Sequence, residues 1–384
     1  MSPGAQKSSH EAADSVAVLV LEDGRVFRGR SWATIGTALG EAVFATGMTG
    51  YQETLTDPSY RGQIVVMTAP HIGNTGINDR DNESDQMWVA GFVVRDPAIA
   101  PSHYESTHSL EDELRAQQIV GIQAVDTRAL TRHLRDRGAM RMGIFSGAAA
   151  HKSVESLLVQ VRSTASMVGA NLTEDVTTTL PYLVPAQGDR RGVIAAIDLG
   201  IKSMTPQRLS ERGLDVWVLP ASVSAEQMLT TGVDGVFFSN GPGDPSSADH
   251  VVELLQSALT ARRPVFGICF GHQMLGRALG LETYKLNFGH RGINQPVQDL
   301  RTGRVAITAH NHGFAVSAPL EGQIDTPFGR AEVSHVCLND NVVEGLRCLD
   351  VPAFSVQFHP EAAAGPHDAD PLFDEFVDLI ERSR

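Results

Sequence analysis

The sequence predicts an α/β protein in two parts: a carboxy-terminal domain on an open, mostly parallel sheet and a separate α+β amino-terminal domain. In the second half, short apolar runs alternate with segments of helix length, which is typical of βαβ units on a parallel sheet. The first half has short β-like runs that are broken by Gly, Asp and Pro clusters. The 384 residues are enough for two domains that each bury a core.

The amino-terminal domain is expected at residues 15–150. Residues 1–14 are rich in Ser, Ala and Gly and are predicted to form a loose tail. Val16–Leu21 follows as the first strand, because this apolar run is far shorter than a membrane span and no basic segment precedes it. Ile64–Thr68 is a second run of the same kind.

A helix is predicted near residues 126–135 of this first domain. Asp126 can accept a hydrogen bond from the first turn of such a helix. Gly138 stands just past its expected end, where a left-handed backbone conformation is common.

The connection between the domains is assigned to residues 151–191, because residues 177–191 lack periodicity and carry turn formers. The second domain then covers residues 192–384. Its predicted strands are Val193–Ile197, Val216–Leu219, Gly235–Ser239 and Val265–Ile268.

Charge and cysteine content exclude several classes of protein. The formal net charge is -14, and Lys and Arg are scattered rather than gathered in one stripe, so a nucleic-acid phosphate backbone would be repelled. Three cysteines are too few for a disulfide framework in a chain of this length, which favours a reducing compartment. We therefore expect a cytoplasmic protein that binds neither nucleic acid nor a membrane.

Cys269 is a candidate nucleophile. An apolar run precedes it, Gly267 and Gly271 flank it, and a helical pattern follows, which together make a Gly-x-Cys-x-Gly turn between a strand and a helix. The glycines leave room for a sharp turn, and a helix amino terminus favours the thiolate form of a cysteine. The alternative is a small buried cysteine, which is what most free cysteines are. We prefer that alternative for Cys337 and Cys348, which lack such glycines.

A base and its orienting group are predicted at the end of a later strand. The run at residues 354–358 alternates as a strand does and delivers His359 at its end, where Pro360 stops the strand. Glu361 can turn back to the imidazole. We predict that His359 is the general base for Cys269 and that Glu361 orients it. The alternative is a structural histidine at a strand end.

Attack of a thiolate on an amide develops an oxyanion, which needs backbone donors. The amide of Phe270 directly follows the nucleophile, and the glycine-rich loop at residues 239–245 follows a buried strand. Glycines in that loop allow the backbone to approach a ligand closely, although an ordinary tight turn gives the same pattern. A phosphate-binding loop is a weaker interpretation, because no Gly-Lys-Ser/Thr follows.

These segments resemble the class I, or triad-type, glutamine amidotransferases. The resemblance rests on Phe-Gly-Ile-Cys-Phe-Gly-His-Gln at residues 266–273 and on His-Pro-Glu at residues 359–361. Residues 239–245, Ser-Asn-Gly-Pro-Gly-Asp-Pro, look like the loop of carbamoyl-phosphate synthetases rather than that of anthranilate or GMP synthases. Four segments of the first half are similar to the small-subunit amino-terminal domain of these synthetases: residues 21–24, 49–53, 57–60 and 126–128.

The resemblance implies a fold, a reaction and a partner. Residues 192–384 would form the sheet of a class I glutamine amidotransferase. Glutamine would become glutamate and ammonia through a γ-glutamyl thioester on Cys269, and the ammonia would pass through a tunnel to a large synthetase subunit. That partner would use ATP and bicarbonate to make carbamoyl phosphate for arginine and pyrimidine synthesis. No cofactor is expected on this chain, whereas ATP and Mg are expected on the large subunit.

The same resemblance implies a set of residues that line the glutamine site: Gly47, Gly241, Gly243, Phe270, Gln273, Asn311, Gly313 and Phe314. Three positions depart from the family pattern. Gly47 stands where some relatives carry Ser, so any contact there comes from the backbone. Phe270 replaces a commoner Leu, and Phe358 precedes the histidine where several relatives have Gly. Neither change removes a catalytic group.

Two further features have open interpretations. His310 and His312 flank Asn311 and resemble a metal-binding pair, but no further ligand stands nearby in the sequence, so we predict no metal site. Lys202 matches the family pattern, although a solvated lysine at a helix start gives the same pattern.

Two other functions fit parts of the sequence. A regulatory subunit that has lost the reaction is disfavoured, because Cys269, His359 and Glu361 are all retained. A stand-alone glutamine or γ-glutamyl hydrolase would need only the triad. The amino-terminal domain and the lack of an ATP-binding signature such as a Walker loop favour instead a synthesis that occurs on another chain.

Overall fold

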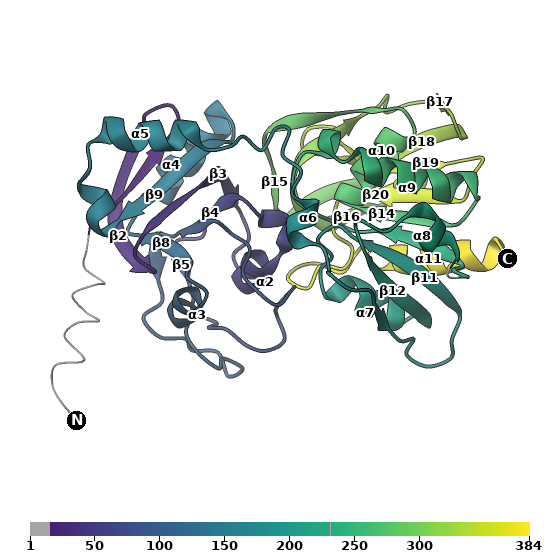
Figure 1. Cartoon of the computed structure of the whole chain (residues 1–384), viewed down its shortest axis with the longest axis horizontal. Helices are drawn as coiled ribbons and strands as arrows, with labels where there is room; N and C mark the ends of the chain where they lie inside the picture. Colours follow the sequence, from purple (N-terminus) through teal and green to yellow (C-terminus); the bar gives the residue numbers. More distant parts are fainter. Residues whose placement is uncertain (1–15, 231) are drawn as a thin grey trace. The chain divides into compact units, whose positions relative to one another are not determined.

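The computed structural model describes residues 16–230 and 232–384 (Figure 1). The loose tail predicted for residues 1–14 lies outside the described residues. The chain forms two compact units, of which the first ends at Met167 and the second begins at Val168. In the part of the chain that is described, no helix is both long enough and apolar enough to cross a membrane.

The first unit is built around a closed barrel with the strand order β1-β2-β8-β6-β4-β3-β9. Both faces of β4 are buried, which explains its uninterrupted apolar sequence. Ile64 packs in one core with Leu130 of α4, and the next residue, Val65, packs in a second core with Leu55 of α2. The elements are β1 (Val16–Leu21), β2 (Val26–Ala33), β3 (Thr37–Ala45), α2 (Tyr51–Thr56), β4 (Gln63–Met67), β5 (His71–Ile72), β6 (Gly91–Val93), β7 (Asp96–Pro97), α3 (Leu110–Ala116), β8 (Val120–Gln123), α4 (Thr127–Arg137), β9 (Met140–Ser146) and α5 (Val154–Ser163).

Helix α4 is the helix predicted near residues 126–135. Asp126 Oδ1 accepts a hydrogen bond from the N–H of Ala129 at 3.0 Å, which caps the amino end. The helix ends at Gly138, whose φ of 96° is unfavourable for a residue with a side chain. The capping interpretation of the sequence is therefore confirmed.

The segment at residues 151–191 contributes to both units. Helix α5 belongs to the first unit, where Leu157 and Val161 pack against Val18 and Phe145 of the barrel. Residues from Val168 onward belong to the second unit, where the short strand β10 pairs antiparallel with β12. The weak periodicity of this segment reflects short elements rather than an element-free linker.

The second unit is an open sheet with the order β10-β12-β11-β13-β14-β20-β19-β18-β15-β16, and β17 pairs with β18 (Figure 1). The strands from β12 to β20 in this order are parallel to one another, as the sequence predicts. The strands from β19 onward extend the sheet in antiparallel fashion. The predicted parallel sheet is thus the centre of a larger mixed sheet.

Helices cover both faces of the parallel part. On β13, Val236 and Phe238 face a core that includes Leu255 of α9 and Leu275 of α10, whereas Phe237 faces a core shared with α7 and α11. The elements are α6 (Thr173–Val176), β10 (Tyr182–Val184), β11 (Gly192–Asp198), α7 (Met204–Ser210), β12 (Leu214–Pro220), α8 (Ala225–Thr230), β13 (Gly235–Phe238), α9 (Asp249–Thr260), β14 (Val265–Ile268), α10 (Phe270–Ala278), β15 (Glu282–Asp299), β16 (Val305–Ser317), β17 (Ile324–Thr326), β18 (Gly329–Cys337), β19 (Val343–Cys348), β20 (Ala353–Val356) and α11 (Pro371–Arg382).

Candidate active site

Cys269 occupies the turn between β14 and α10 with φ 54° and ψ -101°. Positive φ values are strained for residues other than glycine, and such strain is found where function requires it. The flanking glycines have a steric reason. A Cβ on Gly267 would lie 2.7 Å from the backbone of Gly271, and one on Gly271 would lie 2.2 Å from the carbonyl oxygen of Phe238. The two glycines therefore permit a sharp turn that holds Cys269 in a strained backbone conformation.

Strand pairing brings the predicted base to the same edge of the sheet as the thiol. β14 and β20 are parallel, with Ile268 opposite Val356, so the residues after both strands emerge together. The N–H of Cys269 donates to the carbonyl of Val356 at 2.9 Å, and the N–H of His359 donates to the carbonyl of Ala309 at 2.9 Å. These backbone bonds fix where each functional side chain begins.

His359 lies between a carboxylate and the thiol. Its Nδ1 lies 2.6 Å from Glu361 Oε1, and its buried Nε2 has no hydrogen-bond partner among the described residues, so Nε2 is available to Cys269. Burial disfavours the imidazolium, but the charges of Glu361 and Cys269 outweigh that effect and raise the pKa of His359 to about 10. While Glu361 and Cys269 are both charged, the imidazole of His359 is therefore protonated at neutral pH.

Lys202 completes the line of charged groups. Its Nζ lies 3.2 Å from Glu361 Oε1, and the glutamate side chain is fully buried. Burial alone would raise the carboxyl pKa, but Lys202 and His359 reverse the effect and lower the pKa of Glu361 to about 2. Lys202 is itself only 7% exposed. The interpretation of Lys202 as a solvated lysine is wrong, because its ammonium group pairs with a buried carboxylate.

One candidate oxyanion donor, the N–H of Phe270, directly follows Cys269 in the chain. Phe270 is the first residue of α10, so its N–H is among the amides that have no partner within the helix. The glycines of the loop at residues 239–245 pack against the protein's own backbone. A Cβ on Gly241 would lie 2.1 Å from the carbonyl oxygen of Leu199, and Gly243, with φ 99°, would place one 2.6 Å from that of Ala170. Close packing inside the protein is sufficient to require glycine at both positions.

The other residues of the predicted glutamine site divide between the two units. Asn311, Gly313 and Phe314 lie on β16, and the carbonyl of Asn311 is 3.6 Å from the thiol sulfur. Gln273 Nε2 donates to the carbonyl of Phe314 at 2.9 Å and also contacts Gln357 Oε1 at 3.1 Å, so it braces this strand. Gly47 belongs to the first unit, between β3 and α2, and its place in a glutamine site stays a prediction.

Fold and site together define a class of protein, the class I glutamine amidotransferases. The family model described as glutamine amidotransferase class-I matches residues 195–379, which contain Cys269, His359 and Glu361. A second model, described as carbamoyl-phosphate synthase small chain, CPSase domain, matches residues 19–144 in the first unit.

Similar proteins cover nearly the whole chain. The carbamoyl phosphate synthase small chain of Streptomyces coelicolor is 64% identical, with 98% of this chain and 99% of the relative aligned. The small chain of Mycobacterium leprae is 58% identical over 96% of this chain and 100% of its own length. The one from Bifidobacterium longum is 56% identical over 96% and 94%. This chain therefore belongs to the carbamoyl phosphate synthase small chain family.

Proposed function

We propose that this chain hydrolyses L-glutamine to glutamate and ammonia at Cys269 and hands the ammonia to a large synthetase subunit for carbamoyl phosphate synthesis. The observation that carries the proposal is the strained, buried thiol beside an imidazole that two further charged groups hold in place. A structural cysteine would need neither the strain nor the charges.

The first half of the reaction forms a thioester. The thiolate of Cys269 attacks the side-chain amide carbon of glutamine, and the oxyanion that develops is stabilised by the N–H of Phe270. His359, held as an imidazolium, donates its proton to the amide nitrogen, so the C–N bond breaks and ammonia leaves. The γ-glutamyl group remains bound to sulfur, and His359 is left neutral.

The second half regenerates the enzyme. Neutral His359 takes a proton from a water molecule, which attacks the thioester carbon and displaces the thiolate of Cys269. Glutamate leaves with one oxygen from water, and the imidazolium and thiolate are restored. Glu361 stabilises each imidazolium, and Lys202 keeps that carboxylate ionised although it is buried.

The fate of the ammonia follows from family membership. The relatives carry the name of a synthase small chain, which supports a large subunit as the partner of this chain. We place ATP, Mg and bicarbonate on that subunit, with none required here, and place the reaction in the cytoplasm. Its product, carbamoyl phosphate, would serve arginine and pyrimidine synthesis.

The variant Cys269→Ser tests the proposal when the complex with the large subunit is assayed with two nitrogen donors. The hydroxyl has a far higher pKa than a thiol, so thioester formation should stop. Synthesis from glutamine should be lost while synthesis from ammonium persists. Cys348→Ser is the matched control, because Cys348 is also buried but lies on β19 away from the turn; it should keep both activities.

Each result has a separate meaning. Loss of both activities in Cys269→Ser, with Cys348→Ser unaffected, would mean that Cys269 is required for folding or for assembly with the large subunit. Retention of glutamine-dependent synthesis would exclude Cys269 from the mechanism. Size-exclusion chromatography of the mixed subunits tests the partner, since direct transfer of ammonia requires a stable complex; separate elution at micromolar concentration with full glutamine-dependent synthesis would contradict that part of the proposal.

A further inference from the structure

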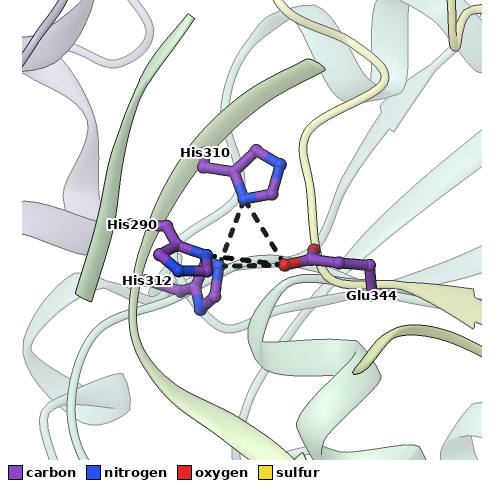
Figure 2. A group of neighbouring side chains, drawn as sticks. All are labelled: His290, His310, His312 and Glu344. Carbon is purple, nitrogen blue, oxygen red and sulfur yellow. Dashed lines mark hydrogen bonds and ion pairs between the residues drawn. The ribbon is translucent and has the colours of Figure 1, made fainter. Parts of the chain in front are cut away.

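Three histidines and a glutamate converge in the second unit, outside the Cys269–His359–Glu361 triad (Figure 2). His310 and His312 are two residues apart on β16 and therefore share a face, and His290 on β15 pairs directly with His312. Glu344 reaches the same point from β19. One nitrogen of each histidine and one carboxylate oxygen all lie within 4.8 Å of one another.

The outer ring nitrogens of this cluster are already bound. His290 Nε2 lies 2.7 Å from a carboxylate oxygen of Asp340. His312 Nδ1 lies 2.9 Å from the carbonyl oxygen of Phe314. His310 Nε2 lies 2.7 Å from the hydroxyl of Thr308, whose own proton goes to a carbonyl. The carboxylate of Asp340 and the carbonyl of Phe314 can only accept, and the Thr308 hydroxyl accepts while its proton goes to Gln295, so in this arrangement each outer nitrogen carries the proton of its ring.

It follows that the inner nitrogens of His310 and His312 present lone pairs. His310 Nδ1 and His312 Nε2 face each other at 3.2 Å, and Glu344 Oε1 lies 3.7 Å from both. His290 Nδ1 is 3.5 Å from the same oxygen. Within the described part of the chain, the two carboxylate oxygens of Glu344 and the Nδ1 of His290 have no hydrogen-bond partner. The side chain of Glu344 is fully buried. The lone pairs of His310 Nδ1 and His312 Nε2 and the carboxylate of Glu344 thus face one another, an arrangement that favours a cation between them.

A proton is a poor occupant of this position. Shared between His290 and Glu344, it would span 3.5 Å, whereas charge-assisted hydrogen bonds are about 2.7–2.9 Å long. It would also leave the lone pairs of His310 and His312 opposed. A metal ion contacts all four groups at once.

We propose that His290, His310, His312 and Glu344 bind one zinc ion. Zn–N and Zn–O bonds of roughly 2.0–2.2 Å in a tetrahedron place ligand atoms about 3.3–3.6 Å apart. The four separations of 3.2, 3.5, 3.7 and 3.7 Å lie close to that range, and the remaining pairs of ligand atoms lie within 4.8 Å of one another. Imidazole nitrogens and a carboxylate oxygen are ligands that zinc accepts, and Asp340, Thr308 and Phe314 supply the outer partners that orient metal-binding histidines.

The site is structural, because the protein fills all four positions and leaves none for substrate. Its consequence concerns β16. Asn311, whose carbonyl oxygen lies near the thiol, stands between two of the ligands, and Phe314 accepts hydrogen bonds from both His312 and Gln273. The ion would hold in place the strand that carries three predicted glutamine-binding residues.

The metal content of the full-length chain tests the proposal without reference to activity. Any affinity tag is removed, the protein is dialysed against metal-free buffer, and metals are measured by mass spectrometry. We expect about one zinc per chain, and a midpoint of thermal unfolding that falls by about 5 °C or more on chelation and recovers with added zinc. Zinc-free protein whose unfolding does not respond to added zinc would overturn the proposal.

Variants of the proposed ligands and of their partners should reduce zinc affinity to different extents. Asp340→Asn removes an outer partner and should weaken zinc affinity by about 10–100-fold, and Glu344→Gln, which removes a ligand, should weaken it further. His335→Asn is the matched control, since His335 is a buried histidine on the neighbouring strand β18 outside the cluster, and it should keep the zinc. Zinc retained at wild-type affinity by Glu344→Gln would overturn the assignment. Four-coordinate Co²⁺ absorption in the wild-type chain, absent from Glu344→Gln, would support it independently of protein stability.

Discussion

Glu361 and Glu344 are both buried among histidines in the same unit, but their surroundings have opposite effects on charge. Lys202 and His359 flank Glu361 and lower its pKa to about 2. At Glu344 burial dominates, and its pKa is raised to about 7. A buried His–Glu pair in this protein therefore acquires its role from the charged groups beside it. At Glu361 a fixed ammonium group keeps the carboxylate ionised beside the imidazole, whereas the neighbours of Glu344 are three imidazoles at 3.5–3.7 Å, which are ligands that a metal ion accepts.

The largest expected effect is on turnover. His359→Asn should reduce glutamine hydrolysis by about a hundredfold to ten-thousandfold, because the group that exchanges protons with both leaving group and water is lost. Glutamine binding, measured by calorimetry, should change little. A turnover within a few-fold of the wild type would mean that His359 has a structural role. The surroundings of Glu361 would then have no catalytic role to set them apart from those of Glu344.

Lys202→Met should destabilise the protein by about 3 kcal/mol, because the buried carboxylate of Glu361 loses one of its two charged partners. Turnover should fall as well, while KM changes less, since the ammonium acts on Glu361 rather than on glutamine. Lys152→Met is the control at an exposed lysine and should have no measurable effect. Chemical denaturation and steady-state kinetics provide both readouts.

The stability contributed by Glu361 and His359 should depend on pH. Glu361 has a folded pKa of about 2 against 4.5 ordinarily, so its contribution is present above pH 4.5 and is lost as pH falls toward 2. His359 has a folded pKa of about 10 against 6.5, so its contribution is full below pH 6.5 and is lost as pH rises through 10.

The free energy of unfolding should therefore differ most between wild type and Glu361→Gln at pH 4.5 to 6.5. The difference should shrink as the pH is raised toward 10. Denaturation curves across this range give the measurement, and a difference that grew with pH would contradict the assigned charges.

Substitution of Glu344 should have the smallest effect on stability, and this effect should have the opposite sign to that of substituting Glu361. In chelator-treated protein, Glu344→Gln should stabilise the fold by about 1 kcal/mol, because it removes a buried charge without a hydrogen-bond partner. Glu361→Gln should destabilise under the same conditions. Destabilisation of the metal-free protein by both changes would mean that the two environments are alike.

Sequence reasoning succeeded where the signal was local. The turn around Cys269 was predictable because the strand, the glycines and the helix are contiguous, and the parallel strands were predictable from their apolar runs. The role of Lys202 was not decided, because its partner Glu361 stands 159 positions later. The sequence did not indicate that His290 and Glu344 lie beside His310 and His312. These residues come together through the antiparallel strand pairs beyond the parallel sheet, which the sequence analysis did not predict.

The alternation of β16 has a further consequence for how the chain tolerates insertion and deletion. His310 and His312 point to one face of the strand, and Asn311 between them points to the other. Adding or removing one residue just before this segment would exchange the faces, placing an amide among the proposed metal ligands and an imidazole on the face that now carries Asn311. Unless a bulge absorbs the change, the strand therefore keeps this arrangement only when its length changes in steps of two, which links the position of the histidines to that of the predicted glutamine-binding residues.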